Sequence, residues 1–269
     1  MREGWAFFRA AVLCPAMRGF LFLRNYSDMA AMTVPRKIKW QRSNQMNKNR
    51  PTSRSRIIQL CITGMLCALA FVAVAVGRVP LIPSMSFLTF DPKDSIIVIG
   101  GLAFGPVAAA AISVIVALVE MLTISTTGPI GFAMNIISSC SFAVTASLIY
   151  KKKHSYKGAL AALGIGWCAM IVAMIFWNWI VTPLYMHVSR DAVAGMLLPA
   201  IIPFNFIKGG INCAIALIIY KPVTAAFRRV GAFPEKQSSD GSEIRFSPKA
   251  LLVALPILAV CIALIFALR

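Results

Sequence analysis

The sequence predicts an all-α membrane protein, with a six-helix bundle that crosses the bilayer repeatedly and a seventh transmembrane helix at its C-terminal end. Of its 269 residues, 59% are hydrophobic and only 13% are charged. The mean hydropathy of +0.77 is high for a soluble domain. The apolar residues form separate runs, several of them close to the ~20 residues that a helix needs to cross the hydrocarbon core. These observations predict a polytopic bundle.

The first predicted helix covers residues 57–77 and follows a basic extension, residues 1–56, that shows no pattern of a folded core. Residues 78–94 contain too many prolines and charges to remain in lipid, so they are predicted to form a long external loop. Within it, Asp91 suits a helix N-cap and Pro92 the first helical position. The next apolar run, residues 95–104, meets Gly105 and Pro106 after only ten residues. The second helix is therefore predicted to be short or to begin inside the loop.

The remaining predicted helices follow in order along the chain. The third covers residues 107–125 and the fourth residues 132–150, with the turn "TTGPIG" between them. The fifth covers residues 158–181 and is followed by a second long loop. The sixth covers residues 200–220, which completes a six-helix core over residues 57–221. A polar linker, residues 222–249, leads to the seventh apolar segment, residues 250–269.

The net charge of +18 is explained by membrane orientation. Of 27 Lys and Arg residues, twelve lie in residues 1–56, and further groups lie in residues 151–157 and 221–249. Counted across alternate sides of the predicted helices, these groups fall on one side, which is the pattern of cytoplasmic segments. We therefore expect a cell-membrane protein with a cytoplasmic N-terminus and outward-facing long loops. No nucleic-acid partner is expected.

Polar side chains of four predicted helices fall in one layer of the outer half of the bilayer. Their depth below the outer boundary is about 5–14 Å at ~1.5 Å per residue. Aromatic residues share this layer and the loop above it, while the inner half of the bundle is almost purely apolar. The pattern predicts a pocket that opens on one side only. The candidate binding residues are Glu120, Asn135, Asn178, Asn205 and Lys208, with the aromatic residues Phe87, Phe90, Trp177 and Tyr185.

Lys208 carries the strongest signal in this layer, because a cation in the bilayer centre costs about 2.5–3.5 kcal/mol. It shares one helix face with Asn205 and Asn212, and Glu120 is the opposite charge that we expect at similar depth. The blander alternatives are helix-to-helix hydrogen bonds of the Asn residues and snorkelling of the lysine. A layer of amides, one cation and flat aromatic rings suits a planar heterocycle with imide-like edges, such as a flavin.

Four stretches resemble the substrate-binding S components of energy-coupling factor (ECF) vitamin transporters, and among these the riboflavin-specific type. They are "FLTFDPKDSIIVIGGLAFGP" (residues 87–106), "TGPIGFAMNIISS" (127–139), "WNWIVTPLY" (177–185) and "PFNFIKGGIN" (203–212). The resemblance covers residues 57–221. It implies a six-helix bundle that binds its vitamin from outside beneath a loop, with Asn178, Asn205 and Lys208 as the expected ligands of riboflavin. The vitamin is cargo, and no cofactor or metal is expected.

The family also implies partner subunits, namely a transmembrane coupling subunit and two ATPases. The chain has no GxxxxGK[ST] motif, so ATP hydrolysis is expected from another polypeptide. Members usually dock through an Ala-x-x-x-Ala pattern on the first helix. Here the small residues are Gly64 with Ala68, and Ala73 with Gly77. The C-terminal segment lies outside the six-helix pattern.

Three alternatives to a riboflavin-binding subunit follow from the sequence. The first is an S component for another vitamin, such as thiamine or a folate. The second is an intramembrane enzyme, which is disfavoured because no paired carboxylates, HExxH or Ser-His arrangement is present. The third is a self-sufficient ion-coupled carrier, which we would expect to show internal repeats and titratable groups at the midplane. The sequence therefore predicts a binding subunit without enzymatic activity.

Overall fold

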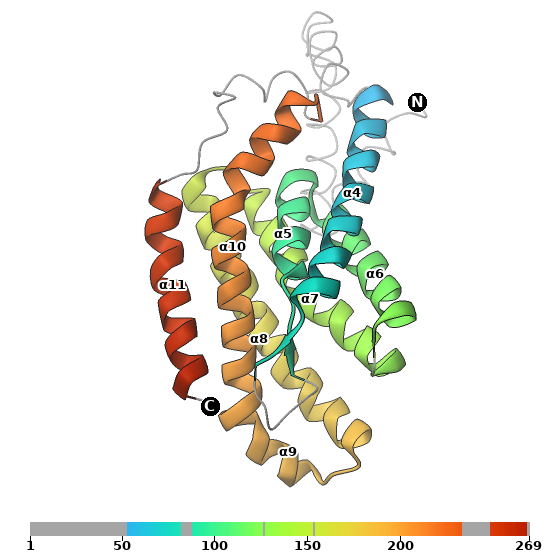
Figure 1. Ribbon diagram of the computed structural model, residues 1–269, viewed down its shortest axis with the longest axis vertical. Helices are drawn as coiled ribbons and strands as arrows, with labels where there is room; N and C mark the ends of the chain where they lie inside the picture. The colour runs from blue at the N-terminus through green and yellow to red at the C-terminus, as the bar shows by residue number, and fades with distance from the viewer. Residues whose placement is uncertain (1–52, 82–87, 126, 153, 233–247, 268–269) are drawn as a thin grey trace, which may run out of the picture. The chain divides into compact units, whose positions relative to one another are not determined.

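The computed structural model describes residues 53–81, 88–125, 127–152, 154–232 and 248–267, and this part of the chain is mostly helical (Figure 1). Six helices are long and apolar enough to cross a membrane, which confirms the predicted fold class. The predicted extension before residue 53 and most of the predicted linker lie outside the described residues. The elements are α4 (Ser53–Gly77), β1 (Val79–Pro80), β2 (Thr89–Phe90), α5 (Lys93–Phe104), α6 (Pro106–Thr123), α7 (Gly128–Tyr150), α8 (Tyr156–Met186), α9 (Arg190–Met196), a π-helical turn (Leu197–Ile201), α10 (Ile202–Arg229) and α11 (Pro248–Ala267).

The short helix α5 lies inside the bundle and contacts α4, α6, α7 and α10. At 12 residues it spans only about 18 Å, roughly half of the bilayer. It ends at Gly105, whose φ of 97° is a conformation that glycine adopts readily, and Pro106 starts α6 at once. Gly101 lets α5 approach α7 closely, because a Cβ there would collide with Ser147 Oγ and Ala109 Cβ. The predicted short second helix is thereby confirmed as a buried half-helix.

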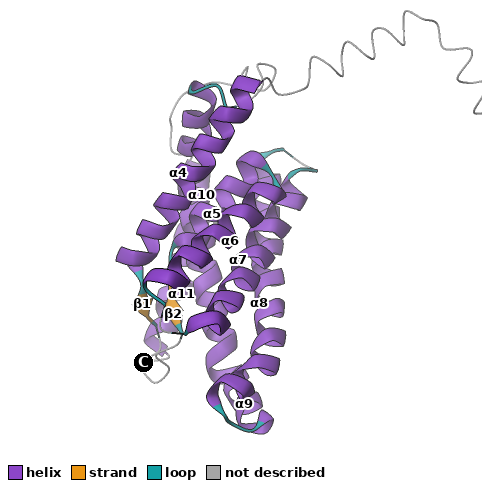
Figure 2. Ribbon diagram, turned by 90° about the vertical axis from the view of Figure 1, so that its right-hand side faces the viewer, coloured by secondary structure: helices purple, strands orange, loops and turns teal. Residues whose placement is uncertain are grey.

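Strands β1 and β2 form a small antiparallel hairpin between α4 and α5 (Figure 2). Val79 pairs with Phe90 and Pro80 with Thr89, and the Leu81 N–H donates to the Leu88 carbonyl at 3.4 Å. The predicted N-cap role of Asp91 is wrong. Pro92 occupies the cap position without a side-chain hydrogen bond, and α5 begins at Lys93.

The second predicted long loop is also wrong, because most of it is helical. Helix α8 continues through Pro183 to Met186, and it ends at His187, which has a left-handed φ of 53°. Ser189 then caps α9 by accepting a hydrogen bond from the Ala192 N–H at 3.3 Å. The π-helical turn joins α9 to α10 without an intervening loop.

Helix α11 packs along α10, as Figure 1 shows in red beside orange. The two helices meet closely at Gly210, where a Cβ would lie 2.6 Å from Cys261 Sγ. The same Cβ would also lie 3.2 Å from the ring of Trp167 of α8. The seventh helix is therefore packed against the bundle in its own right.

Two of the four small residues predicted to dock a partner lie on the open surface of α4. Gly64 and Ala68 are exposed, and nothing approaches Gly64 within 4 Å. Ala73 is half-buried. Gly77 faces Pro92 instead, because a Cβ there would meet the proline ring at 2.9 Å. The end of α4 is thus occupied by contacts with the segment that contains the hairpin, residues 78–81 and 88–92, called the hairpin segment below.

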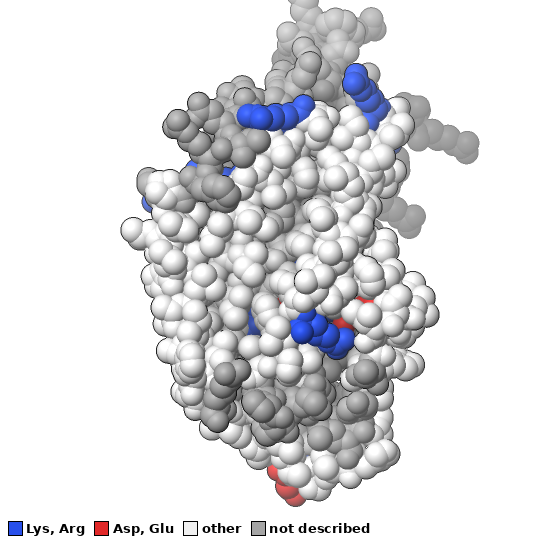
Figure 3. Space-filling model, in the orientation of Figure 1, with Lys and Arg blue, Asp and Glu red and all other residues white. Residues whose placement is uncertain are grey.

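Basic residues gather at the end of the bundle where α4 begins and α10 ends, and most of the face in Figure 3 is uncharged. Arg54 and Arg56 of α4 and Arg228 and Arg229 of α10 belong to this group. The hairpin lies at the other end of α4 (Figure 1). The described charges are therefore distributed unequally along the bundle.

Candidate functional site

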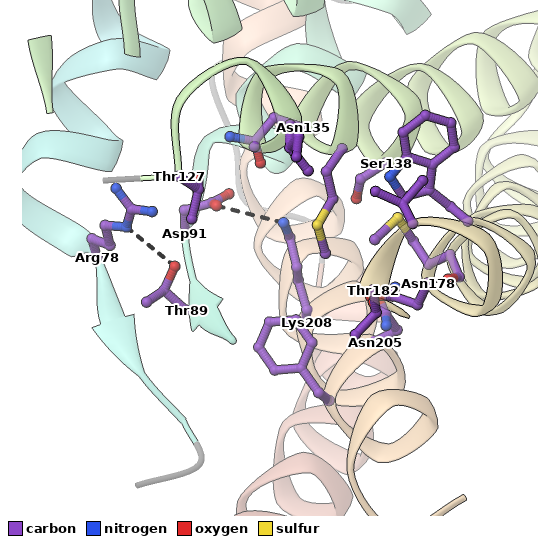
Figure 4. A pocket seen from close by; sticks show the side chains of 17 residues that line it. Arg78, Thr89, Asp91, Thr127, Asn135, Ser138, Asn178, Thr182, Asn205 and Lys208 are labelled. Atoms are coloured by element: carbon purple, nitrogen blue, oxygen red, sulfur yellow. Dashed lines mark hydrogen bonds and ion pairs between the residues drawn. The ribbon is translucent and has the colours of Figure 1, made fainter. Parts of the chain in front are cut away.

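A pocket opens between α7, α8, α10 and the hairpin segment (Figure 4). Its cavity volume is about 70 Å³, and about 780 Å³ of space is not filled by protein atoms when the open solvent at its mouth is included. The lining mixes apolar side chains with amides, hydroxyls and charges. The lining residues are Arg78, Thr89, Asp91, Thr127, Ile130, Gly131, Met134, Asn135, Ser138, Met174, Trp177, Asn178, Val181, Thr182, Phe204, Asn205 and Lys208.

Helix α10 supplies the polar face that its sequence spacing predicts. Asn205, Lys208 and Asn212 are all buried, and residues three and four apart share a helix face. The Asn205 side-chain amide donates at 2.8 Å to the carbonyl of Ile201, the last residue of the π-helical turn. Its oxygen, Oδ1, has no hydrogen-bond partner among the described residues. Asn205 is therefore held by its own helix with an acceptor left over.

Helix α8 presents a second amide in a similar way. The Asn178 side chain donates to the Met174 carbonyl at 2.7 Å. Its oxygen accepts from the Thr182 hydroxyl, one turn further along the same face, at 3.0 Å. These two bonds restrain the Asn178 rotamer. Figure 4 shows Asn178 and Thr182 facing Asn205 across the end of the pocket.

Four lining residues each carry one buried polar atom without a hydrogen-bond partner in the described part of the chain. They combine acceptors, a donor and a hydroxyl, which can act as either. Buried polar groups in native proteins nearly always have a partner, so such a cluster needs an explanation. A bound molecule with alternating donors and acceptors would satisfy them. The atoms are Asp91 Oδ1, Ser138 Oγ, Trp177 Nε1 and Asn205 Oδ1.

Lys208 is buried and lies against two carboxylates of the loop–α5 junction. Its Nζ is 3.5 Å from Asp91 Oδ2 and 3.5 Å from Asp94 Oδ2. The Ser139 hydroxyl donates to the other oxygen of Asp94 at 2.5 Å. The expectation that Glu120 is the opposite charge for Lys208 is therefore wrong. Sequence reasoning assigned Asp91 to a cap and Asp94 to an external loop, and so it left two nearby acids out.

Glu120 lies outside the pocket lining and binds other cations. Its Oε2 accepts from Lys93 Nζ at 2.5 Å, and its Oε1 lies 3.7 Å from Arg78. Lys93 also lies 3.6 Å from Asp91. Three acids and three cations thus form one compact group whose formal charges cancel, which offsets the cost of burying each of them.

The charge state of Asp91, in the loop between β2 and α5, follows from its neighbours. Burial by itself raises the pKa of this carboxyl group. Lys208 and Lys93 outweigh burial and hold the pKa of Asp91 below its ordinary value of 3.8. Asp91 is therefore ionised at neutral pH.

The other predicted site residues fall in several places. Asn135 and Trp177 line the pocket. Phe90 is half-buried in β2 and is not among the lining residues. Phe87 and the side chain of Tyr185 lie outside the described residues. Sequence reasoning missed Arg78, Asp91, Ser138 and Thr182, and only Thr182 had a readable signal, namely its position one turn after Asn178.

Fold and pocket together define a membrane-embedded helical bundle with a pocket near one of its ends. Comparison with known proteins specifies the class. The family described as "ECF transporter, substrate-specific component" matches residues 59–220, so the chain belongs to this family and is a multi-pass membrane protein. The matched region ends before α11.

Several relatives share most of their length with the chain. It is 30% identical over 195 residues to "Riboflavin transporter RibU" of Staphylococcus aureus (strain TCH60), covering 69% of this chain and all of that protein. It is 27% identical over 175 residues to "Riboflavin transporter FmnP" of Bacillus subtilis (strain 168), covering 61% of this chain and 91% of that protein.

A solved structure, described as "Structure and mechanism of the S component of a bacterial ECF transporter", agrees in fold. It superimposes with a TM-score of 0.53 at 30% identity and covers 63% of this chain and 96% of that chain. The family resemblance that the sequence motifs indicate is thereby confirmed. The two relatives are named as transporters and the solved structure as a transporter S component.

Proposed function

We propose that this protein is the riboflavin-binding subunit of an ECF-type importer. It captures the vitamin from outside the cell in the pocket between α7, α8, α10 and the hairpin segment. The observation that carries the proposal is the cluster of buried, unpartnered polar atoms around Asn205 and Lys208. The names of the relatives, which are riboflavin transporters, favour this vitamin over thiamine or a folate.

The chemistry of the pocket matches the pyrimidine edge of the flavin ring, where carbonyl acceptors flank an imide N–H donor. The Lys208 ammonium supplies a donor for a carbonyl, and the free Asn205 oxygen supplies an acceptor for an N–H. The Trp177 N–H is a second donor. Asn178 and Asn135 complete the proposed set. Phe87, Phe90 and Tyr185 remain proposed contacts of the ligand.

The proposed orientation of the protein in the membrane is inferred from its basic residues. Arg54, Arg56, Arg228 and Arg229 lie at the end of the bundle away from the hairpin, and such residues favour the cytoplasm. The N-terminus is then cytoplasmic and the pocket end faces outward. A transmembrane coupling subunit and two ATPases complete the importer. The coupling subunit docks on the outer face of α4, around Gly64 and Ala68.

Binding measurements on the purified full-length protein test the proposal. Riboflavin fluorescence should be quenched on binding, and the dissociation constant for riboflavin should lie well below those for thiamine and folate. If thiamine or folate binds more tightly than riboflavin, that vitamin is the substrate in place of riboflavin. Reconstitution in liposomes tests the partners, because the chain alone should not accumulate riboflavin. Robust accumulation without ATPases would contradict an importer subunit.

A further inference from the structure

Glu120 forms ion pairs with a cation at each end of the hairpin segment. This segment, residues 78–81 and 88–92 in the described part of the chain, leaves α4 at Arg78 and enters α5 beside Lys93. One oxygen of the Glu120 carboxylate lies 3.7 Å from Arg78, and the other accepts from Lys93 at 2.5 Å. A single side chain of α6 therefore holds two points that lie 15 residues apart in the sequence.

The closer of these two contacts, between Glu120 and Lys93, is buried. Lys93 and Glu120 are each 1% exposed, and a charge-assisted hydrogen bond in such a setting is both stronger and more directional than one in water. The Arg78 side chain is 26% exposed and also donates from Nε to the Thr89 hydroxyl at 3.1 Å. Thr89 of β2 is thus connected to Glu120 through Arg78, the residue before β1.

The hairpin segment brings its own residues to the pocket. Thr89 and Asp91 line it, and Asp91 holds Lys208 at 3.5 Å. Lys93 touches Asp91 at 3.6 Å as well as Glu120. A chain of contacts therefore runs from Glu120 through Lys93 and Asp91 to the pocket lysine, although Glu120 is not itself among the lining residues.

We propose that Glu120 is a positioning residue for ligand binding, which anchors both ends of the hairpin segment and thereby sets the place of Asp91 and Lys208 in the pocket. This inference rests on the proposed riboflavin binding. It differs from the role that the sequence predicts for Glu120, which is direct contact with the ligand or with Lys208.

The test compares affinity and stability in three full-length variants. Glu120→Gln keeps the shape of the side chain and removes its charge. Lys93→Met removes one of the two cations that Glu120 contacts. The double variant carries both substitutions. Pairwise coupling within one salt-bridge network corresponds to about 2- to 150-fold in an equilibrium constant. We expect Glu120→Gln to raise the riboflavin Kd at least about fivefold and to lower the thermal midpoint. Asp191→Asn, an exposed carboxylate on α9, is the matched control and should change neither.

The double variant separates positioning from charge balance. It restores equal numbers of acids and cations, so the thermal midpoint should recover toward that of the wild type. The anchor at α5 remains absent, so the Kd should stay raised at least about threefold. Wild-type affinity in the double variant, or in Glu120→Gln, would overturn the proposal. If Glu120→Gln does not fold, the riboflavin Kd values of the double variant and of Lys93→Met test the proposal without it.

Hydrogen exchange supplies a readout that general destabilisation does not produce. The Leu81 amide, which donates to Leu88 within the hairpin, should exchange faster in ligand-free Glu120→Gln than in the wild type, while amides of α7 stay unchanged. A uniform increase would contradict a local anchor. If the wild-type protein does not bind riboflavin, the proposed function fails, whereas unchanged exchange at Leu81 rejects the anchor alone.

Discussion

Replacing Lys208 by methionine tests the pocket most directly. The ammonium group is buried, and its two carboxylate neighbours lie at 3.5 Å, a long distance for a charge-assisted hydrogen bond. It therefore has donor capacity left for a ligand carbonyl. Loss of a charged donor to a buried partner costs about 1.5–3 kcal/mol. We expect Lys208→Met to weaken riboflavin binding by about ten- to a hundredfold.

The same substitution should also lower stability. Without Lys208, the acids Asp91, Asp94 and Glu120 face only Lys93 and Arg78, and one buried charge is left uncompensated. Breaking a buried ion pair typically costs about 3–5 kcal/mol. The double variant Lys208→Met with Asp94→Asn removes one charge of each sign, so its thermal midpoint should recover while its affinity for riboflavin stays low.

Fluorescence titration and thermal unfolding of the same preparations are the assays. Lys221→Met is the matched control, because Lys221 lies on the same helix and is exposed; its affinity and midpoint should equal those of the wild type. Affinity of Lys208→Met within about threefold of the wild type would refute the reasoning. Lys208 would then be a structural ion-pair partner and would not belong to the binding set.

Three further predictions concern packing, pH and the C-terminal helix. Gly101→Ala should lower the thermal midpoint, because the added Cβ would collide with Ser147 and Ala109. Gly64→Ala is the control and should not lower it, because nothing lies within 4 Å of that position. Equal midpoints for the two variants would contradict the packing argument. Because the lysines depress the pKa of Asp91 below 3.8, its contribution to stability is complete above that value and is lost only as the pH falls through the lowered pKa. The difference in thermal midpoint between the wild type and Asp91→Asn should therefore stay constant between pH 8 and pH 5, and a change in that difference would contradict the depressed pKa of Asp91. Truncation after residue 234 should leave the riboflavin Kd within about tenfold of the wild type, because no residue of α11 lines the pocket. A larger loss in binding titrations would mean that α11 supports the site.

The positions of the long helices could be predicted from apolar runs alone, because bilayer thickness sets a length that the sequence must meet. The segment after α8 could not be predicted in this way. Pro183 and the polar residues that follow suggested a loop, but α8 continues past the proline and Ser189 caps a further helix. A proline followed by polar residues is therefore only a weak signal of a helix end.

Among the site residues, those on regular helices were predicted best. Asn178, Asn205 and Lys208 follow from helical spacing and depth, and all three line the pocket. Asp91 was not predicted, because its partner lies 117 residues away in sequence and no periodicity connects the two. Glu120 was placed at a suitable depth but assigned to the wrong cation, since depth says nothing about direction around a helix axis.

Asn212 ties the hairpin segment to α10 through backbone atoms only. Its side chain accepts from the Ser95 N–H at 3.0 Å and donates to the Asp91 carbonyl at 3.2 Å. Because both partners are main-chain groups, the join does not depend on which side chains occupy positions 91 and 95. Aspartate at 212 could only accept and leucine could do neither, so each would remove at least one of these two hydrogen bonds. The pocket can therefore change its side chain at position 91 while the backbone at the start of α5 stays joined to α10.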